Sequence, residues 1–417
     1  MRSLHRPLWL ASALALGTLA PSIPARANYR AKAVEQMDFI QRSFYDSQQA
    51  IYRGKTPVDP KGLPFDVSWG NGVQLSALAG ATRLDPDRYK STLIAFSGGL
   101  QRYWDDQVPI PGFDAYFASP TDNDKYYDDN EWFVLGLTES YNATKDARFL
   151  TWARQTQNFA LSGWDDKLGG GIYWQQNKLE SKNTCSNAPA AVSALALYNV
   201  EHKPEDLDWA KRIYAWTKSH LQDTDGLYLD NVAIADGKIT NWKFTYNSAL
   251  MMRAAAGLWR ATGDATYKAD SIRIADASLK EFADPATGGF KDGARFNHLL
   301  SEALLEEYET TKDGRYLNAV RRDADFAYRN VRDTKNGGYF NDWKIQNRAP
   351  DERKELIENA AVARLFWLLT PYPDVEELQA RGDDAFKRGD AIGAARLFRE
   401  ALASTSGAPT SVTTPAA

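Results

Sequence analysis

The sequence predicts an all-α protein in which helical hairpins close into an (α/α)6 toroid, followed by a short C-terminal helical hairpin. Two kinds of loop alternate along the chain and recur roughly every 50 to 60 residues, the length of one helical hairpin with its two loops. Alternation of apolar and polar residues, which would indicate strands, is scarce between these loops. Because repeated hairpins bury their apolar faces against their neighbours, about six of them are expected to form a closed ring.

The first kind of loop is a short polar turn with a Thr-x-Asp pattern. It occurs at Thr144 to Leu150, Thr262 to Tyr267 and Thr311 to Leu317. The second kind is longer and rich in glycine and aromatic residues. It occurs at Gly169 to Trp174, Asp225 to Tyr228, Gly288 to Phe290 and Gly337 to Phe340. The alternation places short turns at one end of the hairpins and long loops at the other.

The segments between the loops have helical patterns rich in alanine, leucine and aromatic residues. The clearest examples run from Ala188 to Tyr198, from Ser248 to Thr262 and from Ile357 to Leu369. In a toroid the long loops would gather around one cleft. The adjacent residues Asp128 and Asp129 would then lie at the loop end of an inner helix.

The N-terminal segment has the pattern of a secretory signal peptide. Arg2 and Arg6 precede an apolar run from Leu8 to Leu19, and small residues surround the expected cleavage site after Ala27. The apolar run is too short to span a membrane. We therefore expect residues 1–27 to be removed and the mature protein, starting near Asn28, to be periplasmic or secreted.

Length and charge restrict the organisation and the partners of the chain. About 390 mature residues with one continuous repeat pattern predict a single large domain over residues 28–370. The formal net charge is −4, and removal of residues 1–27, which contain three arginines and no acid, makes it more negative. Nucleic acid and anionic membranes are therefore poor partners.

The cysteine and histidine content argues against several kinds of site. Cys185 is the only cysteine, so no internal disulfide can form. His202, His220 and His298 are too few and too scattered for a zinc site or a histidine-based catalytic triad. No metal and no cofactor is predicted.

The run from Tyr126 to Trp132 carries the strongest candidate chemistry, because it sets Asp128 and Asp129 among aromatic residues at the start of a helical segment. A glycosidic bond is cleaved by two carboxyl groups, one ionised and one protonated. The positive end of the helix dipole would keep Asp128 ionised as the nucleophile. The like charge and the surrounding rings would push Asp129 toward the protonated form that an acid needs.

Simpler interpretations of these aspartates stay open. Asp128 followed by Glu131 also fits a capping box, in which the carboxylate only caps the helix. Three further Asp-Asp pairs weaken the signal: Asp105-Asp106, Asp165-Asp166 and Asp383-Asp384. The first follows Trp104 and is the serious competitor, whereas the second is expected in a solvated turn and the third in a helix without aromatic neighbours.

Several motifs together resemble glycoside hydrolase family 76, the endo-α-1,6-mannanases. They occur in order at Tyr126 to Trp132, Gly169 to Trp174, Asn183 to Ala191 and Trp242 to Asn247. The resemblance spans roughly residues 30 to 370 and implies an (α/α)6 barrel and retention of anomeric configuration. It also implies an adjacent Asp pair with the nucleophile first and the acid/base second. These roles would fall on Asp128 and Asp129.

Other motif positions are candidates for binding mannose by hydrogen bonds or stacking. They are Asn130, Asn187, Asp230, Trp242 and Tyr246, and for each a role in holding loops is the alternative. Two positions depart from the family pattern. Cys185 and Glu131 stand where small residues are expected, so the shape of a subsite could differ.

Beyond residue 370 the composition changes. Residues 371–403 resemble one tetratricopeptide-like helical hairpin, which cannot bury its apolar face alone. It is expected to pack on the barrel or, as the alternative, to contact a partner protein. Residues 404–417, rich in Ser, Thr, Pro and Ala, are expected to be disordered.

The sequence thus predicts an exported retaining endo-α-1,6-mannanase that acts on α-mannan or α-1,6-manno-oligosaccharides. The alternatives are a transglycosylase, a different sugar-active α/α-toroid enzyme, and a non-catalytic glycan-binding protein in which the Asp pair only caps a helix. The sequence leaves open the natural source of the mannan, endo against exo action, and the oligomeric state.

Overall fold

The structure, a computed structural model, describes residues 28–106, 110–117, 124–343 and 353–405. The predicted signal peptide, residues 1–27, and residues 406–417 of the predicted tail lie outside the described residues. Among the helices that are described, none is both long and apolar enough to cross a membrane.

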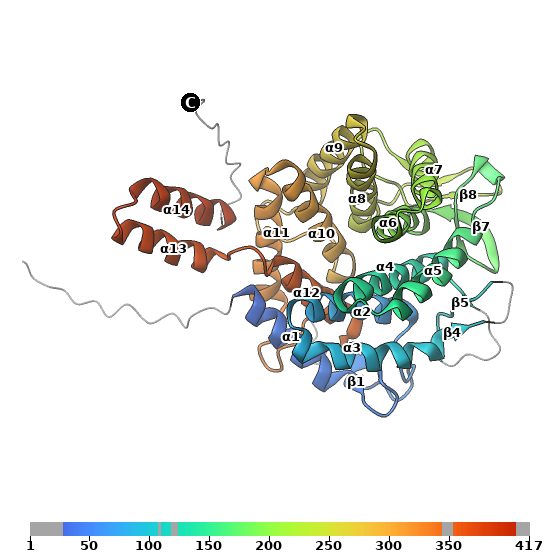
Figure 1. Ribbon diagram of the computed structural model, residues 1–417, viewed down its shortest axis with the longest axis horizontal. Coiled ribbons are helices and arrows are strands. Elements are labelled where there is room, and N and C mark those ends of the chain that lie inside the picture. Colours follow the sequence, from blue (N-terminus) through green and yellow to red (C-terminus); the bar gives the residue numbers. More distant parts are fainter. Residues whose placement is uncertain (1–27, 107–109, 118–123, 344–352, 406–417) are drawn as a thin grey trace, which may run out of the picture.

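Six inner helices form a closed ring (Figure 1). They are α2 (Ser68–Leu84), α4 (Tyr127–Thr144), α6 (Thr184–Glu201), α8 (Thr245–Thr262), α10 (Ala294–Thr311) and α12 (Leu356–Leu369). Each packs against the next, and α12 packs against α2, which closes the ring.

Six outer helices surround this ring. They are α1 (Tyr29–Ser43), α3 (Pro86–Leu100), α5 (Ala147–Ser162), α7 (Pro204–Leu221), α9 (Ala265–Phe282) and α11 (Gly314–Phe326), the last followed by a π-helical turn, η3 (Ala327–Val331). Helices α3, α5, α7, α9 and α11 each pack on the inner helix before them, and α1 packs on α12. The predicted (α/α)6 toroid of helical hairpins is therefore confirmed.

Inner and outer helices differ in the way their sequences distribute apolar residues. In α6 every residue from Thr184 to Leu195 is buried, because other helices cover this half of it on all sides. In α5 the buried residues form one stripe that includes Phe149, Ala153 and Ala160, at helical spacing. This difference makes α6 an inner helix and α5 an outer one.

The three polar turns join an inner helix to the following outer helix, as predicted. In each, the aspartate caps the outer helix by accepting a hydrogen bond from the backbone N–H two residues later; these caps are Asp146, Asp264 and Asp313. The residue before each aspartate has a left-handed backbone, with φ between 58° and 76°. This conformation ends the inner helix and turns the chain.

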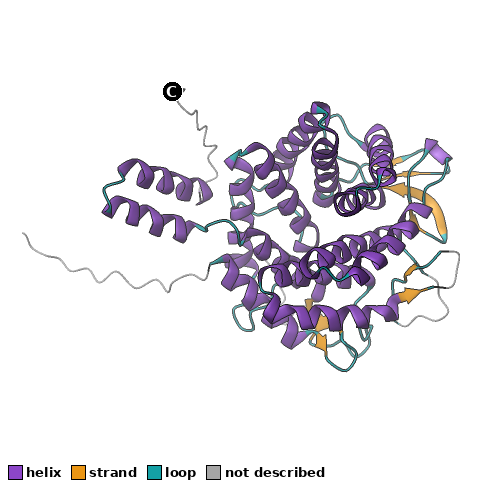
Figure 2. Cartoon of the chain, in the orientation of Figure 1, coloured by secondary structure: helices purple, strands orange, loops and turns teal. Residues whose placement is uncertain are grey.

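The longer loops at the other end contain short strands that the sequence did not predict (Figure 2). A four-stranded antiparallel sheet contains β6 (Tyr173–Gln175), β7 (Lys178–Asn183), β8 (Asn231–Ala233) and β9 (Ile239–Thr240) in this order. Three two-stranded pairs are β1 (Tyr45–Asp46) with β2 (Ile51–Tyr52), β3 (Lys55–Thr56) with β10 (Lys354–Glu355), and β4 (Trp104–Asp105) with β5 (Gly112–Phe113). Short 3-10 turns are η1 (Gln101–Tyr103) and η2 (Lys167–Gly169). The strands are short and largely polar, so they lack the alternation that predicts strands.

The fourth residue of each inner helix ties a loop to the ring. These residues are Asn71, Asn130, Asn187, Ser248, Asn297 and Asn359. Asn187, for example, accepts from the backbone N of Ile172 at 2.8 Å and donates to the Ile172 carbonyl at 2.9 Å. Asn359 accepts from the backbone N of Tyr339 at 2.8 Å in the same way. The repeated contact holds the loops near the starts of the inner helices.

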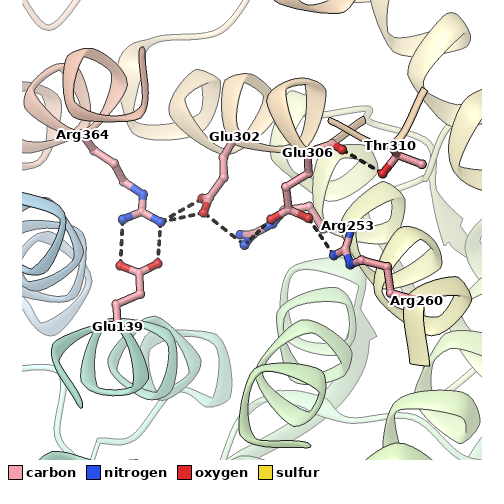
Figure 3. A network of polar contacts seen from close by, with 7 residues as sticks. All are labelled: Glu139, Arg253, Arg260, Glu302, Glu306, Thr310 and Arg364. Atoms are coloured by element: carbon pink, nitrogen blue, oxygen red, sulfur yellow. Dashed lines mark hydrogen bonds and ion pairs between the residues drawn. The ribbon is translucent and has the colours of Figure 1, made fainter. Parts of the chain in front are cut away.

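A layer of buried and half-buried charges lies across the ring, at and beyond the middle of the inner helices (Figure 3). Arg364 of α12 donates to Glu139 of α4 at 2.6 and 2.8 Å and to Glu302 of α10 at 2.8 and 2.9 Å. Arg253 of α8 pairs with Glu302 at 3.1 Å and with Glu306 at 2.9 Å. The layer therefore joins four inner helices. Beyond it, a cavity of about 700 Å³ opens at the helix C-termini.

Helices α13 (Val375–Lys387) and α14 (Ala391–Thr405) form the predicted C-terminal hairpin, which projects from the ring in Figure 1. Helix α14 packs on α11, where Arg321 pairs with Glu400 at 3.2 Å and donates to Ser404 at 3.1 Å. Packing on the barrel is the first of the two arrangements expected from the sequence. The hairpin also leaves Phe386 and Ile392 exposed, and contact with a partner protein stays a prediction.

Candidate active site

Asp128 and Asp129 are the second and third residues of α4, in the first turn of the helix. The N-cap is Tyr126, so Asp128 does not occupy the capping position. Glu131 is fully buried, and neither of its carboxyl oxygens meets a hydrogen-bond donor in the described part of the chain. The capping-box interpretation is therefore wrong, because the helix begins before Asp128 and Glu131 does not reach back to it.

Hydrogen bonds surround the carboxyl group of Asp128. Its Oδ1 accepts from the backbone N of Asp129 at 3.0 Å, and its Oδ2 accepts from the Trp174 indole at 3.1 Å. Burial raises the pKa of Asp128, while hydrogen bonds from Cys185, from the Asp129 backbone and from Trp174 oppose this rise. These donors stabilise the ionised form that a nucleophile requires.

The carboxyl group of Asp129 has a different environment. Burial and the neighbouring charge of Asp128 raise the pKa of Asp129 further above its ordinary value than that of Asp128. One hydrogen bond opposes the rise, from the Ser68 hydroxyl to Oδ2 of Asp129 at 2.5 Å. Ser68 is the first residue of α2 and is fully buried. The pair thus favours one proton, on Asp129, which is the order expected from the sequence.

Two of the predicted binding residues, Tyr246 and Asp230, lie near Asp128 together with Cys185. Tyr246 and Cys185 are the second residues of α8 and α6, the same helical position that Asp128 has in α4. Burial and the charge of Asp128 raise the pKa of the Cys185 thiol, with a further contribution from Asp230. Burial raises the pKa of Asp230, against a hydrogen bond from Asn231. The starts of α4, α6 and α8 thus bring Asp128, Cys185 and Tyr246 together, and Asp230, in the loop before β8, lies beside them.

Aromatic side chains surround this group. Tyr126 and Trp174 meet edge to face at 5.1 Å between ring centroids, and Tyr246 stacks on Phe296 at 4.7 Å. Trp174 is 43 % exposed and Trp242 is 64 % exposed. Exposed indole rings offer apolar faces to the C–H faces of a sugar.

Asn130 and Asn187 do not belong to the binding surface. Both are fully buried. Asn130 accepts from the backbone N of Phe113 at 2.7 Å and donates to the Phe113 and Tyr126 carbonyls at 2.9 Å. Asn187 makes the equivalent bonds to Ile172 and Asn183. We therefore correct their predicted role in binding mannose. The amides of Asn130 and Asn187 hydrogen-bond to backbone groups and, as the fourth residues of α4 and α6, they hold loops in place.

The competing Asp pairs have structural partners. Asp105 pairs with the buried Lys125 at 2.8 Å. Asp165 accepts from the buried Lys182 at 2.6 Å and from the Tyr173 hydroxyl at 2.7 Å, so it is not merely a solvated turn residue. Asp383 and Asp384 lie on α13, outside the ring. Over the described ranges, His, Cys, Asp and Glu side chains form no group of three or more that could hold a metal ion.

The sequence profile of glycosyl hydrolase family 76 matches residues 29–363. The chain belongs to this family. The match covers the whole ring except the last residues of α12 and leaves out the C-terminal hairpin.

Named relatives of this family 76 chain come from yeasts. The mannan endo-1,6-alpha-mannosidase DCW1 of Saccharomyces cerevisiae is 27 % identical over 216 residues, which are 48 % of this chain and 46 % of the relative. The protein of the same name from Candida glabrata is 35 % identical over 111 residues, 24 % of this chain and 25 % of the relative. In both cases the matched segment spans less than half of the relative.

Solved family 76 structures have the same fold over nearly their whole length. An alpha-mannanase of Bacteroides thetaiotaomicron matches with a TM-score of 0.78 at 26 % identity, covering 83 % of this chain and 96 % of that one. An inactive variant of the alpha-1,6-mannanase of Salegentibacter sp., in complex with alpha-1,6-mannotriose, matches with a TM-score of 0.69 at 26 % identity, covering 82 % and 98 %. In that variant asparagine replaces two consecutive aspartates.

Sequence reasoning missed Ser68 and Trp174 as neighbours of the catalytic candidates in this family 76 chain. Trp174 ends one of the Gly-aromatic loops, and its contact with Asp128 depends on the fold of β6. Ser68 precedes Asp129 by 61 residues. Only a comparison of the first residues of the six inner helices with one another would have indicated that Ser68 lies near Asp129.

Proposed function

We propose that the protein is a retaining glycoside hydrolase that cleaves α-1,6-mannosidic bonds in mannan, with Asp128 as nucleophile and Asp129 as general acid/base. The observation that carries the proposal is the pair of adjacent carboxyl groups in one helical turn, in which burial raises both pKa values but raises that of Asp129 further, so that the single proton of the pair favours Asp129. The relative that is inactive when two consecutive aspartates become asparagines, and that contains α-1,6-mannotriose, supports the need for an adjacent aspartate pair and supports the substrate.

In the first step, a carboxylate oxygen of Asp128 attacks the anomeric carbon while Asp129 gives its proton to the leaving glycosidic oxygen. The electron pair of the broken C–O bond stays on that oxygen, and a glycosyl ester forms on Asp128. Ser68 donates to Oδ2 of Asp129, so the transferred proton comes from Oδ1. In the second step, ionised Asp129 takes a proton from water, which attacks the same carbon and releases Asp128.

The test is incubation of the mature protein with linear α-1,6-mannan and α-1,6-mannotetraose, beside the Asp128→Asn variant. Short oligosaccharides from the parent protein alone are expected, and NMR of the first products should show the α anomer. A β product would contradict retention. Longer products formed with added mannoside acceptors would favour a transglycosylase. Mannan binding without turnover in the parent protein would favour the glycan-binding alternative.

Replacement of Ser68 by alanine should change the pH dependence of the reaction. The Ser68 hydroxyl lowers the pKa of Asp129, so its removal raises that pKa. Since Asp129 must be protonated to act as the acid, the basic limb of the kcat profile should move to higher pH, by about one unit. The matched control is Ser193→Ala, because Ser193 is equally buried but donates to the Pro189 carbonyl within α6. An unchanged basic limb in Ser68→Ala would contradict the assignment of Asp129.

Export is also part of the proposal. Residues 1–27 carry the signal-peptide pattern, and Asn28 caps α1 by accepting from the backbone N of Ala31 at 2.9 Å. Cleavage before Asn28 would leave the cap of the first helix intact. Mass spectrometry of the protein from the periplasm or the medium should show a mature N-terminus at or within a few residues of Asn28. An intact N-terminus on the exported protein would contradict cleavage.

A further inference from the structure

The cavity of about 700 Å³ lies at the end of the ring opposite to the catalytic candidates. Its walls come from five inner helices, α2, α4, α8, α10 and α12, and from the segment that follows α12. On α4, Asn142 of the wall follows Asp128 by 14 residues, which is about 21 Å at the rise of an α-helix. The cavity is therefore separate from the cleft at the starts of the inner helices.

The charges around this cavity are balanced. The lining contains three arginines and four glutamates: Arg83, Arg260, Arg364, Glu139, Glu302, Glu306 and Glu309. Arg364 pairs with Glu139 and Glu302, and Arg260 pairs with Glu306 at 3.2 Å (Figure 3). Arg253, which is not part of the lining, pairs with Glu302 and Glu306 and supplies a fourth positive charge. A charged ligand would compete with these partners, so the cavity favours a neutral one.

Polar groups of the lining still have capacity for further hydrogen bonds. Arg83 is exposed, and neither Arg83 nor Ser76 has a hydrogen-bond or ion-pair partner among the described residues. The side chains of Arg260 and Glu306 are 44 % and 27 % exposed although they pair with each other. A guanidinium group donates, a carboxylate accepts and a hydroxyl does both. Each of these groups can therefore bind a hydroxyl of a ligand.

Much of the remaining lining is apolar or aromatic. Trp259, Leu368 and Tyr372 line the cavity and are half-buried. The Tyr372 hydroxyl donates to Glu309 at 2.8 Å, and Lys268 covers one face of the Trp259 ring at 4.6 Å. A concave site of several hundred Å³ with aromatic walls and a few fixed polar groups is typical of ligand-binding sites.

This combination of walls suits a sugar. A purely apolar ligand would remove the charged pairs from water without offering them hydrogen bonds, which is costly. A sugar presents hydroxyl groups to the guanidinium and carboxylate groups and an apolar C–H face to the aromatic side chains. The ligand class that matches all parts of the lining is therefore a neutral oligosaccharide.

We propose that this cavity is a second, non-catalytic binding site for a segment of the substrate polysaccharide. The inference rests on the proposed α-mannanase function for the identity of the polysaccharide, and it adds a site at the opposite end of the ring. A mannan particle held there keeps its other chains near Asp128 and Asp129. The effective concentration of the polymer at the catalytic pair is thereby raised without any new contact to the reacting bond.

Gly80 of α2 offers a way to block the cavity without disturbing the helix. It lines the cavity, and beyond its own helix a Cβ there would meet only Cβ of Trp367, at 3.8 Å, which is an ordinary van der Waals contact. Leucine is also a better helix former than glycine. Gly80→Leu should therefore fold normally and place its side chain in the cavity.

The experiment compares kcat/KM for long linear α-1,6-mannan with kcat/KM for α-1,6-mannotetraose in the mature parent protein and in Gly80→Leu. We expect Gly80→Leu to lower the value for mannan about 10-fold and to leave the value for the tetraose unchanged, because only the polymer gains from a second contact. The matched control is Gly98→Leu. Gly98 lies exposed on α3, where a Cβ would meet nothing within 4 Å, and it is not part of the cavity.

Binding can also be measured without turnover, by electrophoresis in gels that contain linear α-1,6-mannan. The Asp128→Asn protein should be slowed by the mannan. Addition of Gly80→Leu to this protein should weaken the effect, with an apparent Kd about 10-fold higher. Addition of Trp259→Ala instead, which removes an aromatic wall on α8, should change the mobility in the same direction.

Three results would overturn the second site. Equal losses on mannan and on the tetraose would mean that Gly80→Leu acts on the fold or on the catalytic pair. Unchanged rates and unchanged mobility would mean that no mannan binds in the cavity. A changed substrate ratio in Gly98→Leu would show that the ratio does not report the cavity. If the parent protein cleaves neither substrate, the proposed function fails instead, and the gel mobilities still test the cavity.

Discussion

Replacement of Asp128 or of Asp129 by alanine should lower kcat on α-1,6-mannan by about four orders of magnitude. Without Asp128 no glycosyl-enzyme can form, and without Asp129 the leaving oxygen departs unprotonated. Initial rates of reducing-end release measure both effects. Asp166→Ala is the matched control, because Asp166 also belongs to an Asp-Asp pair but is exposed in a turn, and it should retain full activity.

The two variants should differ in one respect. An aryl manno-oligosaccharide with an acidic phenol as leaving group needs little protonation. Asp129→Ala should therefore form the glycosyl-enzyme on such a substrate at close to the parental rate and accumulate it, whereas Asp128→Ala should not. Mass spectrometry of the protein after brief incubation detects this intermediate. Accumulation in Asp128→Ala, or its absence in Asp129→Ala, would mean that the roles are reversed or that the mechanism is different.

Replacement of Arg364 by methionine should lower the free energy of unfolding by about 3–5 kcal/mol, because it leaves the half-buried Glu139 without its arginine and the buried Glu302 with Arg253 alone. Arg364 is 6 % exposed and joins Glu139 with Glu302 across the ring. Denaturant unfolding followed by circular dichroism measures the change. The control is Arg381→Met, since Arg381 pairs with Glu377 on the exposed surface of α13 and should cost less than about 0.5 kcal/mol. A loss below about 1 kcal/mol in Arg364→Met would contradict the importance of the charged layer.

The same layer should also set part of the acid stability. Burial alone would raise the pKa of Glu302, but Arg253 and Arg364 outweigh burial and lower this pKa below its ordinary value of about 4.3. A lowered pKa in the folded state contributes stability above the unfolded value, and this contribution is lost as the pH falls toward the lowered pKa. The free energy of unfolding should therefore decrease more steeply between about pH 4.5 and pH 2 in the parent protein than in Glu302→Gln.

The sequence was sufficient to predict the ring because both kinds of loop leave local signals. The Thr-x-Asp turns have caps and left-handed residues that act within a few positions, and glycine next to aromatic residues identifies the other end. The β6 to β9 sheet was not predictable in this way. The strand Lys178–Asn183, for example, is mostly polar and is exposed over its first three residues, and it is stabilised by pairing with a segment about 50 residues away.

The site was only partly predictable, for a related reason. The adjacency of Asp128 and Asp129 is visible in the sequence, and so is the helical pattern that follows it. Asn130 and Asn187 were misassigned because an amide that binds a backbone and an amide that binds a sugar look the same in sequence. Ser68 was missed because its relation to Asp129 arises only when α2 and α4 pack side by side.

The contacts that close the ring join the two ends of the catalytic domain, and this affects the order in which it folds. Gln36 of α1 donates to Asn359 of α12 at 2.9 Å, across 323 positions of the chain, and β3 pairs with β10. Until α12 is in place, α1 and α2 each lack one of their packing neighbours in the ring. Contacts this distant in sequence are slow to form. Closure of the ring thus requires the last inner helix, and a chain that ends before Leu356 lacks the element needed to complete it.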